Sequence, residues 1–258
     1  MSTRAGTQQA VVRSREQLST HLVRLVLDVD GFASTGIADE WVGLVVPGQF
    51  QSRYYTVRAY DATSVTIDIV VHEHGLVTEW AADDVVGQTV TLSDAKGSYA
   101  PPATAATLLL VGDLTAFPAM ARIAEETSLP TRIWAESPDR LEDYFPDSAE
   151  VTWEPLGPQS RLSAIVSDIA WPDGEVYFWM AGESAQMRAI RKLLMHERAL
   201  PSTHYDVMGY WRNVAGRQPR AVDPGPIWRA GKAQGKTDAE IWADYDSAQN
   251  HQHAGENE

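Results

Sequence analysis

The spacing of apolar residues changes character near residue 102, and this change limits the chain to a fold with two differently built halves. Upstream, "SVTIDIVV" places Val65, Ile67 and Ile69 on one face and Thr66 and Asp68 on the other, the period of two that is typical of a strand. "HLVRLVLDV" and "TVTLSD" repeat this alternation more briefly, and "GQ", "KGS" and "APPA" mark turns. Short strands without a long helix predict an antiparallel β-barrel.

Downstream of residue 102, continuous apolar runs alternate with segments of helical spacing. "TLLLVG", "TRIWAES", "VTWEP" and "EVYFWMAG" indicate strands, of which the first and last are apolar enough to be covered on both faces. "TAFPAMARIAEET", "RLSAIVSDI" and "SAQMRAIRKLLMHER" indicate helices, with Thr115 expected to cap the first and Pro118 to lie in its first turn. This alternation predicts a parallel sheet with right-handed crossovers.

The sequence therefore predicts three regions in the 258 residues: a barrel domain over residues 1–102, an α/β domain over residues 103–215, and a C-terminal extension over residues 216–258. Within the extension, "TDAEIWADYDSAQ" contains a capping box formed by Thr237 and Glu240, which predicts a short helix docked through Trp242. The last residues, "NHQHAGENE", are expected to fray.

Composition excludes several classes of function. The chain has no cysteine, which rules out disulfides, a thiolate nucleophile and a cysteine-bound iron–sulfur cluster, so a redox protein of this sequence must borrow its electron carrier. A net charge of −14 disfavours nucleic acids and anionic membranes as partners. The chain also lacks an apolar run of about 18 residues and the apolar centre of a secretory signal near its start, so we expect a cytoplasmic protein without membrane insertion.

Two stretches of the first half bring together groups that suit a phosphorylated ring compound. In "SRYYTVRAY", Arg53 offers a planar cation for a phosphate, Tyr55 an aromatic face and Thr56 a hydroxyl for a ring nitrogen; the alternative is a solvent-facing arginine beside a core tyrosine. In "HEHGLVTEWAA", Gly75 precedes Thr78 at an expected helix start, where free backbone amides favour a pyrophosphate. An ordinary turn and cap is the alternative for this second stretch.

Two stretches of the second half have the order strand, glycine-containing turn and helix. They are "LLLVGDLTAFPAMARI" and "FWMAGESAQMRAIRKLL", and neither contains the GxGxxG fingerprint of dinucleotide-binding proteins. Because the carboxyl ends of parallel strands meet at one edge of a sheet, we expect the two turns to lie side by side and to form a nucleotide cleft.

Five motifs in a fixed order resemble one known family. "RYYTVR", "GLVTEWA", "GDLTAFPAMARI", "WMAGESAQMRAIR" and "MGYWR" are similar to those of the siderophore-interacting proteins, flavin-dependent ferric-siderophore reductases related to the ferredoxin reductases. The resemblance covers about residues 11–212. It implies an FAD-binding antiparallel β-barrel followed by an NAD(P)H-binding α/β domain with a parallel sheet. It also implies reduction of Fe(III) to Fe(II), which releases iron from its chelate and serves iron transport and homeostasis.

The resemblance also implies roles for individual residues, none of them as an acid, base, nucleophile or metal ligand. The implied FAD-binding residues are Arg53, Tyr54, Tyr55, Thr56, His72, Gly75, Val77 and Thr78. The implied NAD(P)H-binding residues are Gly112, Asp113, Thr115, Ala116, Ser137, Arg140, Gly182 and Glu183, with residues 210–212 closing over the cleft. Arg58 and Arg212 are the candidates for binding an anionic ferric siderophore.

Several alternatives stay open at this level. Arg58 has a second interpretation as the partner of a neighbouring carboxylate. At the end of the second parallel strand, Arg140 with Ser137 favours the 2′-phosphate of NADPH, whereas Glu136 favours the free ribose hydroxyl of NADH. A related flavin oxidoreductase that uses ferredoxin or another electron partner, and a siderophore-binding protein without redox chemistry, are the rival functions.

The sequence departs from its relatives at two places and carries one further weak signal. "SDAKGSY" stands where relatives usually have a Gly-Pro pair, and Ala181 stands where ferredoxin reductases have a cysteine. Hydride transfer depends on positioning rather than on a thiolate, so we expect activity to survive the second change. His72 and His74 flank Glu73 on an expected strand, but a metal site there would lack a third ligand.

Overall fold

The computed structural model describes residues 6–72, 75–212 and residue 234 of the chain. Its first part is a closed barrel of six antiparallel strands in the order β1-β2-β5-β4-β3-β6, as the sequence predicted. The strands are β1 (Thr7–Ser19), β2 (Leu22–Val29), β3 (Trp41–Val45), β4 (Arg53–Tyr60), β5 (Ser64–Val70) and β6 (Thr89–Ser93), with helix α1 (Leu76–Ala82) between β5 and β6.

Alternation along β5 builds the barrel core. Val65, Ile67 and Ile69 are fully buried and pack with residues of the other strands inside the barrel. Asp68 points to the opposite face but is buried as well, where it accepts two hydrogen bonds of 2.8 Å from Arg24 and one of 2.5 Å from the Tyr144 hydroxyl. The outer face of this strand therefore anchors the barrel to the second half of the chain.

The second part is a five-stranded parallel sheet in the order β11-β10-β7-β8-β9, which confirms the predicted architecture. From β7 the chain adds two strands on one side of β7 and then returns to add two on the other, so β7 and β10 flank the point where the strand order reverses. Ligands of such sheets bind at the carboxyl ends of the strands beside this point. The strands are β7 (Thr107–Asp113), β8 (Thr131–Ser137), β9 (Ala149–Pro155), β10 (Val176–Glu183) and β11 (Tyr205–Trp211).

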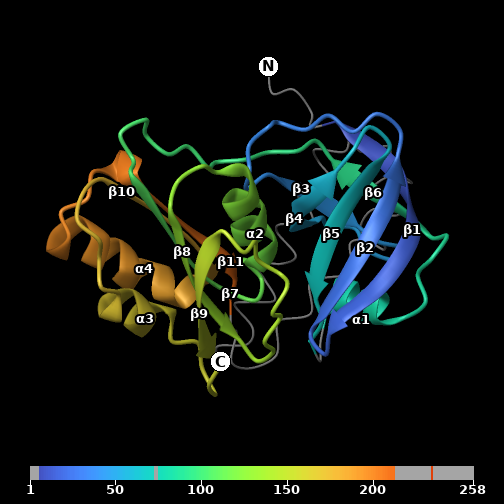
Figure 1. Cartoon of the computed structure of the whole chain (residues 1–258). Coiled ribbons are helices and arrows are strands. Elements are labelled where there is room, and N and C mark those ends of the chain that lie inside the picture. The colour runs from blue at the N-terminus through green and yellow to red at the C-terminus, as the bar shows by residue number, and fades with distance from the viewer. Residues whose placement is uncertain (1–5, 73–74, 213–233, 235–258) are drawn as a thin grey trace. The chain divides into compact units, whose positions relative to one another are not determined.

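Helices cover both faces of this sheet (Figure 1). Helix α2 (Phe117–Glu126) packs on the face that carries Leu108 and Leu110, whereas α3 (Leu162–Asp168) and α4 (Ser184–Lys192) pack on the face of Leu109 and Val111. A π-helical turn, η1 (Leu193–Glu197), follows α4, and a 3₁₀ turn, η2 (Ser202–His204), precedes β11. The uninterrupted apolar run of β7 is thus explained, because its alternate residues enter two different cores.

The cap predicted for α2 was wrong. The helix begins after Ala116 without a side-chain cap, and the Thr115 hydroxyl instead donates to the Asp113 carboxylate at 2.5 Å. Thr115 lies one residue ahead of the N-cap residue, and a hydrogen bond to the charged carboxylate two residues earlier holds its hydroxyl there. Pro118 lies in the first turn of the helix, as predicted.

The predicted boundary at residue 102 falls in the connection between the last barrel strand and the first strand of the sheet. The barrel and the sheet, within residues 6–212, belong to one compact unit. The predicted helix with Thr237, Glu240 and Trp242 lies outside the described residues, so it stays a prediction. Among the helices of the described segments, none has the length and apolar character needed to cross a membrane.

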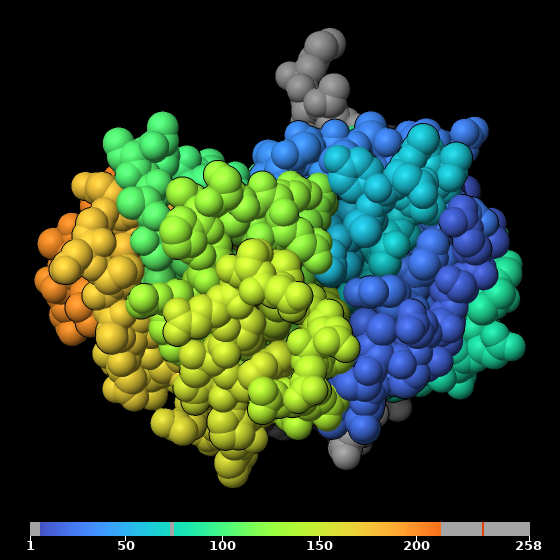
Figure 2. Space-filling model, in the orientation of Figure 1, coloured from blue at the N-terminus to red at the C-terminus, as the bar shows by residue number. Residues whose placement is uncertain are grey.

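Polar contacts join the barrel to the sheet. On the face seen in Figure 2, the yellow-green segment between β8 and β9 lies against the blue β1–β2 hairpin, where Asp139 accepts hydrogen bonds from the backbone and ring nitrogens of His21 at 3.1 and 2.9 Å. Asp39, ahead of β3, is fully buried and accepts from the Trp179 indole at 3.3 Å. Barrel and sheet are therefore fastened at several points within one unit.

One of these contacts makes stability depend on pH. The Ser98 hydroxyl lies 2.8 Å from Asp39 and 2.7 Å from Asp206, yet it has a single proton to donate. Burial raises the pKa of Asp206, and the nearby Asp39 carboxylate acts in the same direction, so Asp206 holds its proton to a higher pH than an aspartate in water does. A carboxyl with a raised pKa in the folded state binds its proton more tightly there than in the unfolded chain, so stability falls as pH rises from the ordinary value of 3.8 through the raised value.

Urea unfolding of the wild type and of Asp206→Asn across this pH range checks the prediction. The amide supplies the same donor at every pH, so the stability of the variant should lack the decline that Asp206 causes in the wild type. Parallel curves for the two proteins would contradict the assignment of the proton.

Candidate functional site

Strand β4 carries the residues of the "RYYT" motif, and its register with β3 is regular from Arg53 to Thr56. Because side chains alternate along a strand, Arg53 and Tyr55 share one face and Thr56 lies on the other. Tyr55 packs against the barrel core, and burial raises its pKa to about 12 while the charge of Arg53 opposes the shift. Tyr54 is 65% exposed. The structure thus brings Arg53 and Tyr55 together and turns Thr56 toward the opposite face of the strand.

Thr56 faces the end of the parallel sheet. It is 6% exposed, and its hydroxyl lies close enough to that of Tyr210 on β11 to lower the pKa of Tyr210, which burial raises. The Tyr210 hydroxyl is itself buried and has no hydrogen-bond partner of good geometry among the described residues. The two hydroxyls therefore mark where β4 of the barrel and β11 of the sheet approach one another.

The turn before α1 has the backbone that the sequence predicted, but its side chains are already engaged. Gly75 has a φ of 138°, and its amide donates to the Glu79 carboxylate at 3.1 Å. The Thr78 hydroxyl accepts from the His72 amide at 2.8 Å, so it is engaged within the protein, although α1 has no side-chain cap. Val77 is buried in the barrel core. The amide of Gly75 therefore faces an anionic group, as it would in a phosphate site, while Thr78 stabilises the turn.

The interpretation of the two histidines as metal ligands cannot be followed in the structure, because Glu73 and His74 lie outside the described residues. Across the described part of the chain, no group of three or more His, Cys, Asp or Glu side chains is arranged to hold a metal ion.

At the carboxyl edge of the sheet, β7, β10 and β11 converge on Asp113. This carboxylate is 6% exposed and accepts from the Thr115 hydroxyl at 2.5 Å, the Thr115 amide at 3.0 Å and the Trp211 indole at 2.6 Å. Burial raises the pKa of Asp113, which Thr115 and Trp211 oppose. Gly182 has a φ of 155°, and a Cβ there would lie 2.7 Å from Asp113 Oδ2. The turns that follow β7 and β10, which the sequence predicted to lie side by side, therefore meet.

The connection of β10 to α4 also reaches this edge. Glu183 is half-buried and lies 3.4 Å from Gln186, and the Ser184 hydroxyl donates to the Trp211 carbonyl at 2.8 Å. On the other side, α2 approaches β7 so closely that a Cβ on Gly112 would lie 2.5 Å from that of Ala116. A small residue at Gly112 is therefore what allows the helix to start directly over the end of the strand.

The end of β8 carries the residues proposed to distinguish NADPH from NADH. Glu136 is 1% exposed, and its two oxygens accept from the Ser160 hydroxyl and the Arg161 amide, each at 2.6 Å. The Ser137 hydroxyl accepts from the Asp139 amide at 3.1 Å. Arg140 is 67% exposed, 3.6 Å from Glu142. Of the three residues proposed to distinguish the cofactors, Glu136 and Ser137 are buried, and Arg140 is exposed.

The two arginines proposed for the siderophore differ in their surroundings. Arg58 donates two hydrogen bonds to Glu125 on α2, at 2.8 and 2.5 Å, and its side chain is 13% exposed. The structure thus shows the alternative that the sequence left open for Arg58, a neighbouring carboxylate. Arg212 directly follows β11 and is exposed, beside Trp211 at the carboxyl edge. Arg212 is the arginine of the pair that stays available to an anion.

Comparison with known proteins places these features. The family described as "Siderophore-interacting FAD-binding domain" matches residues 48–99, and "Siderophore-interacting protein" matches residues 105–214. An uncharacterised protein of Mycobacterium tuberculosis is 30% identical over 253 residues, which cover 78% of this chain and 88% of that protein. The chain belongs to the siderophore-interacting protein family.

Other members and neighbours extend the comparison. The ferric vibriobactin reductase of Vibrio cholerae is 27% identical over 173 residues, or 62% of this chain and 64% of that protein. A siderophore utilization protein from T. fusca has a TM-score of 0.69 at 26% identity, covering 82% of this chain and 94% of that one. A ferredoxin reductase of carbazole 1,9a-dioxygenase has a TM-score of 0.66 at 19% identity over 82% of this chain and 71% of that one, so the fold is ferredoxin-reductase-like.

Proposed function

We propose that this member of the siderophore-interacting family is an FAD-dependent ferric-siderophore reductase that takes electrons from NADPH or NADH. The observation that carries the proposal is the meeting of Thr56, on the barrel strand of the "RYYT" motif, with Tyr210, next to the Asp113–Trp211 contact at the carboxyl edge of the sheet. Flavin-side and nicotinamide-side groups are thereby brought to one place.

The residues present fit FAD. Arg53 is exposed and offers a planar fork for a phosphate, and the half-buried Tyr55 ring lies on the same side of β4. Gly75, at the start of α1, has a positive φ and no side chain of its own, so an anion can approach the backbone at this residue. The Thr56 hydroxyl, which lies next to that of Tyr210, can bond a polar atom of the ring. The phosphate, the ring and the polar edge of FAD thus each have a candidate binding residue in this chain.

When bound, FAD would accept two electrons as a hydride and release them singly, which a nicotinamide donor and an iron acceptor require. The side chains of this chain bind and orient rather than exchange protons. Asp113 holds the Trp211 indole at 2.6 Å over the turn that begins α2, and the absence of a Cβ at Gly182 leaves room for that carboxylate. The ferric siderophore is the substrate, and reduction to Fe(II) weakens its attraction to hard oxygen ligands, so the iron is released.

The donor is proposed from the fold and from charge. Arg140 is an exposed cation near the end of β8, as is Arg161, whose amide bonds Glu136, so a 2′-phosphate has cationic side chains available there. The net charge of −14 disfavours docking of an acidic ferredoxin.

Anaerobic mixing of the FAD-loaded protein with NADPH, NADH or reduced ferredoxin tests the proposal. Bleaching of the flavin absorbance by a nicotinamide, faster than by ferredoxin, is the expected result. A protein that binds a ferric siderophore but takes up no FAD would instead be a binding protein without redox chemistry.

Arg212 should contribute to binding an anionic ferric siderophore. An exposed ion pair is worth about 0.2–1 kcal/mol, so Arg212→Ala should raise the KM for such a substrate about 1.4- to fivefold and leave that for a neutral ferric chelate unchanged. Arg132→Ala is a matched control, because Arg132 is also exposed but lies at the start of β8 and not at its carboxyl end. Equal losses on the anionic and neutral substrates would contradict this role of Arg212.

A further inference from the structure

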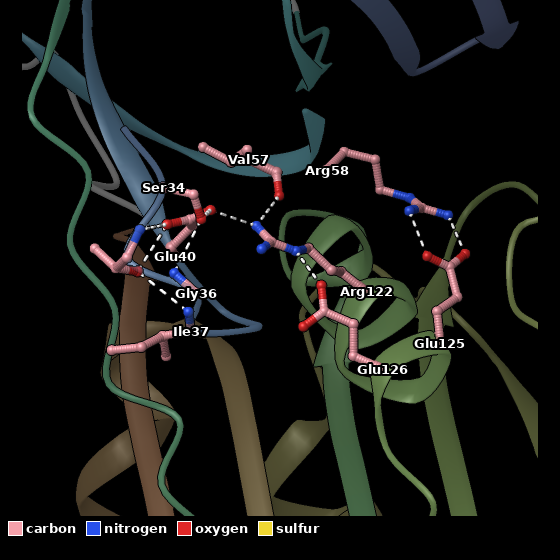
Figure 3. A network of polar contacts seen from close by, with 10 residues as sticks. Ser34, Gly36, Ile37, Glu40, Val57, Arg58, Arg122, Glu125 and Glu126 are labelled. Carbon is pink, nitrogen blue, oxygen red and sulfur yellow. Dashed lines mark hydrogen bonds and ion pairs between the residues drawn. The ribbon is translucent and has the colours of Figure 1, made fainter. Parts of the chain in front are cut away.

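A single buried arginine of α2 joins the helix to the barrel (Figure 3). Arg122 is 3% exposed, and its Nη1 donates to Glu40 at 2.9 Å and to the Val57 carbonyl at 3.0 Å. Its Nε donates to Glu126 at 2.7 Å, and its guanidinium lies 5.0 Å from the centre of the Tyr60 ring. Arg122 therefore contacts a loop of the barrel, strand β4 and its own helix at once.

Glu40, which faces Arg122, is held in place by further hydrogen bonds. Its carboxylate is fully buried and accepts from the Ser34 hydroxyl at 2.7 Å, the Thr35 amide at 2.6 Å and the Thr35 hydroxyl at 2.7 Å. Burial acts to raise the pKa of Glu40, but the hydrogen bonds from Ser34, Thr35 and Arg122 outweigh it, so the pKa is lowered. Glu40 is thus an anion in a preformed loop, and Arg122 is its one cationic partner within the described residues.

These contacts end next to both halves of the proposed site. Val57 follows Thr56 directly, and its amide donates to the Glu40 carbonyl at 2.9 Å while its carbonyl accepts from Arg122. Helix α2 begins immediately after the turn of Asp113 and Thr115. One guanidinium group therefore fixes the strand that carries the flavin-side residues relative to the helix that carries the donor-side turn.

We propose that Arg122 is a positioning residue for hydride transfer, which sets the placement of the Asp113 turn relative to β4 through the Glu40 carboxylate and the Val57 carbonyl. The inference rests on the proposed function. Hydride transfer needs reacting atoms about 3–3.5 Å apart, and a displacement of about 1 Å can slow such a step about a hundredfold. A contact that sets the position of the Asp113 turn relative to β4 should therefore change the rate of hydride transfer more than it changes the affinity for FAD or for the nicotinamide donor.

Stability alone is a weaker account of this joint. The net contribution of a buried ion pair is commonly no larger than that of packed apolar residues, because both charges lose their water. The same helix and strand are already joined by the Arg58–Glu125 pair, and the helix also packs in an apolar core with Leu22 of β2. The Arg122 guanidinium also fixes the orientation of α2 relative to β4, because its hydrogen bonds to three acceptors from separate segments set its plane.

The double variant Glu40→Gln/Arg122→Met tests the inference, because it removes both charges and leaves no buried ion alone. Its matched control is Glu150→Gln/Arg132→Met, the same two chemical changes at the exposed pair between β8 and β9. Unfolding midpoint, FAD affinity and the limiting rate of flavin reduction by saturating NADPH or NADH are measured for each protein. The chain has no native cysteine, so spin labels on cysteines introduced at the exposed Thr89 and Met195 report the distance between barrel and sheet in the absence of FAD.

The expected result for the double variant is an FAD affinity and an apparent donor affinity within threefold of the wild type, a limiting reduction rate at least tenfold lower, and a broader label distance distribution. The control should match the wild type throughout. Electron transfer from the chemically reduced double variant to a ferric siderophore should keep its wild-type rate, because that step does not involve the donor-side turn.

A folded double variant with a wild-type limiting rate and distance distribution would overturn the inference. If the double variant does not fold, Arg122→Lys takes its place, since lysine keeps the cation but lacks the fork; wild-type values in that variant would overturn the inference, and slower reduction with broader distances would support it. If neither nicotinamide reduces the wild type, the proposed function fails, and the label distances alone then decide the role of Arg122.

Discussion

Arg122→Met, made while Glu40 stays acidic, should lower the free energy of unfolding by about 3–5 kcal/mol. The substitution leaves a fully buried carboxylate without its cation, and an uncompensated buried charge costs about this much. For a chain of this size each kcal/mol lowers the melting temperature by about 2–4 °C, so the loss is large enough to follow by urea unfolding and by thermal melting.

The comparison with Glu40→Gln/Arg122→Met isolates the charge. Because the amide needs no cation, the double variant should recover most of the stability that the single variant loses. Glu150→Gln provides a second control, since Glu150 is 73% exposed and the exposed pair it forms with Arg132 should contribute less than about 1 kcal/mol. Equal stabilities for the single and double Arg122 variants would show that the buried carboxylate is not the cause.

Arg53→Ala should weaken FAD binding by about 10- to 150-fold. The proposed contact is a charge-assisted hydrogen bond between a guanidinium and a phosphate, which is worth about 1.5–3 kcal/mol. Arg53 is exposed at the start of β4, so its replacement should leave the melting temperature of the FAD-free protein nearly unchanged. Titration of the FAD-free protein with FAD, followed by quenching of flavin fluorescence, gives both affinities.

Arg13→Ala is the matched control for Arg53, because Arg13 is an exposed barrel arginine that pairs with Asp28 on the neighbouring strand. Its FAD affinity should equal that of the wild type. Arg53→Lys should bind FAD with intermediate affinity, since lysine keeps the charge without the planar fork. Unaltered FAD binding by a folded Arg53→Ala protein would remove Arg53 from the phosphate site.

Much of the fold could be predicted because local patterns carried it. Val65, Ile67 and Ile69 alternate as their burial requires, and the run "TLLLVG" is apolar because both of its faces are covered. Strand β1 was not recognised, since only Ala10 and Val12 of its residues are buried and the rest is polar. Strand β11 was quoted as a motif but not predicted as a strand, because it is an edge strand with a mixed burial pattern.

The candidate site was predicted by residue type and not by contact. The sequence drew attention to Asp113 and Trp211, but the hydrogen bond between them joins residues 98 positions apart. Glu40, in "IADEWVG", looks like a surface acid and is fully buried, and its partner Arg122 lies 82 positions away. The spacing of Arg122 and Glu126 on one helix is a local sign of their ion pair, but nothing local indicates that Glu125 pairs with Arg58 or that Glu40 pairs with Arg122. Which polar groups are free and which are paired follows from tertiary packing alone.

The account depends most on passage of electrons from FAD in this chain to siderophore-bound iron. The direct measurement is anaerobic mixing of the FAD-loaded, fully reduced protein with a ferric siderophore and an Fe(II)-specific chelator. The control replaces the ferric siderophore by the gallium(III) complex of the same siderophore, in which the metal is not reduced. The account predicts that flavin absorbance returns as the Fe(II) signal grows, with about two Fe(II) formed for each FAD, and that the gallium complex leaves the flavin reduced. A flavin that stays reduced in the presence of the bound ferric siderophore would contradict it.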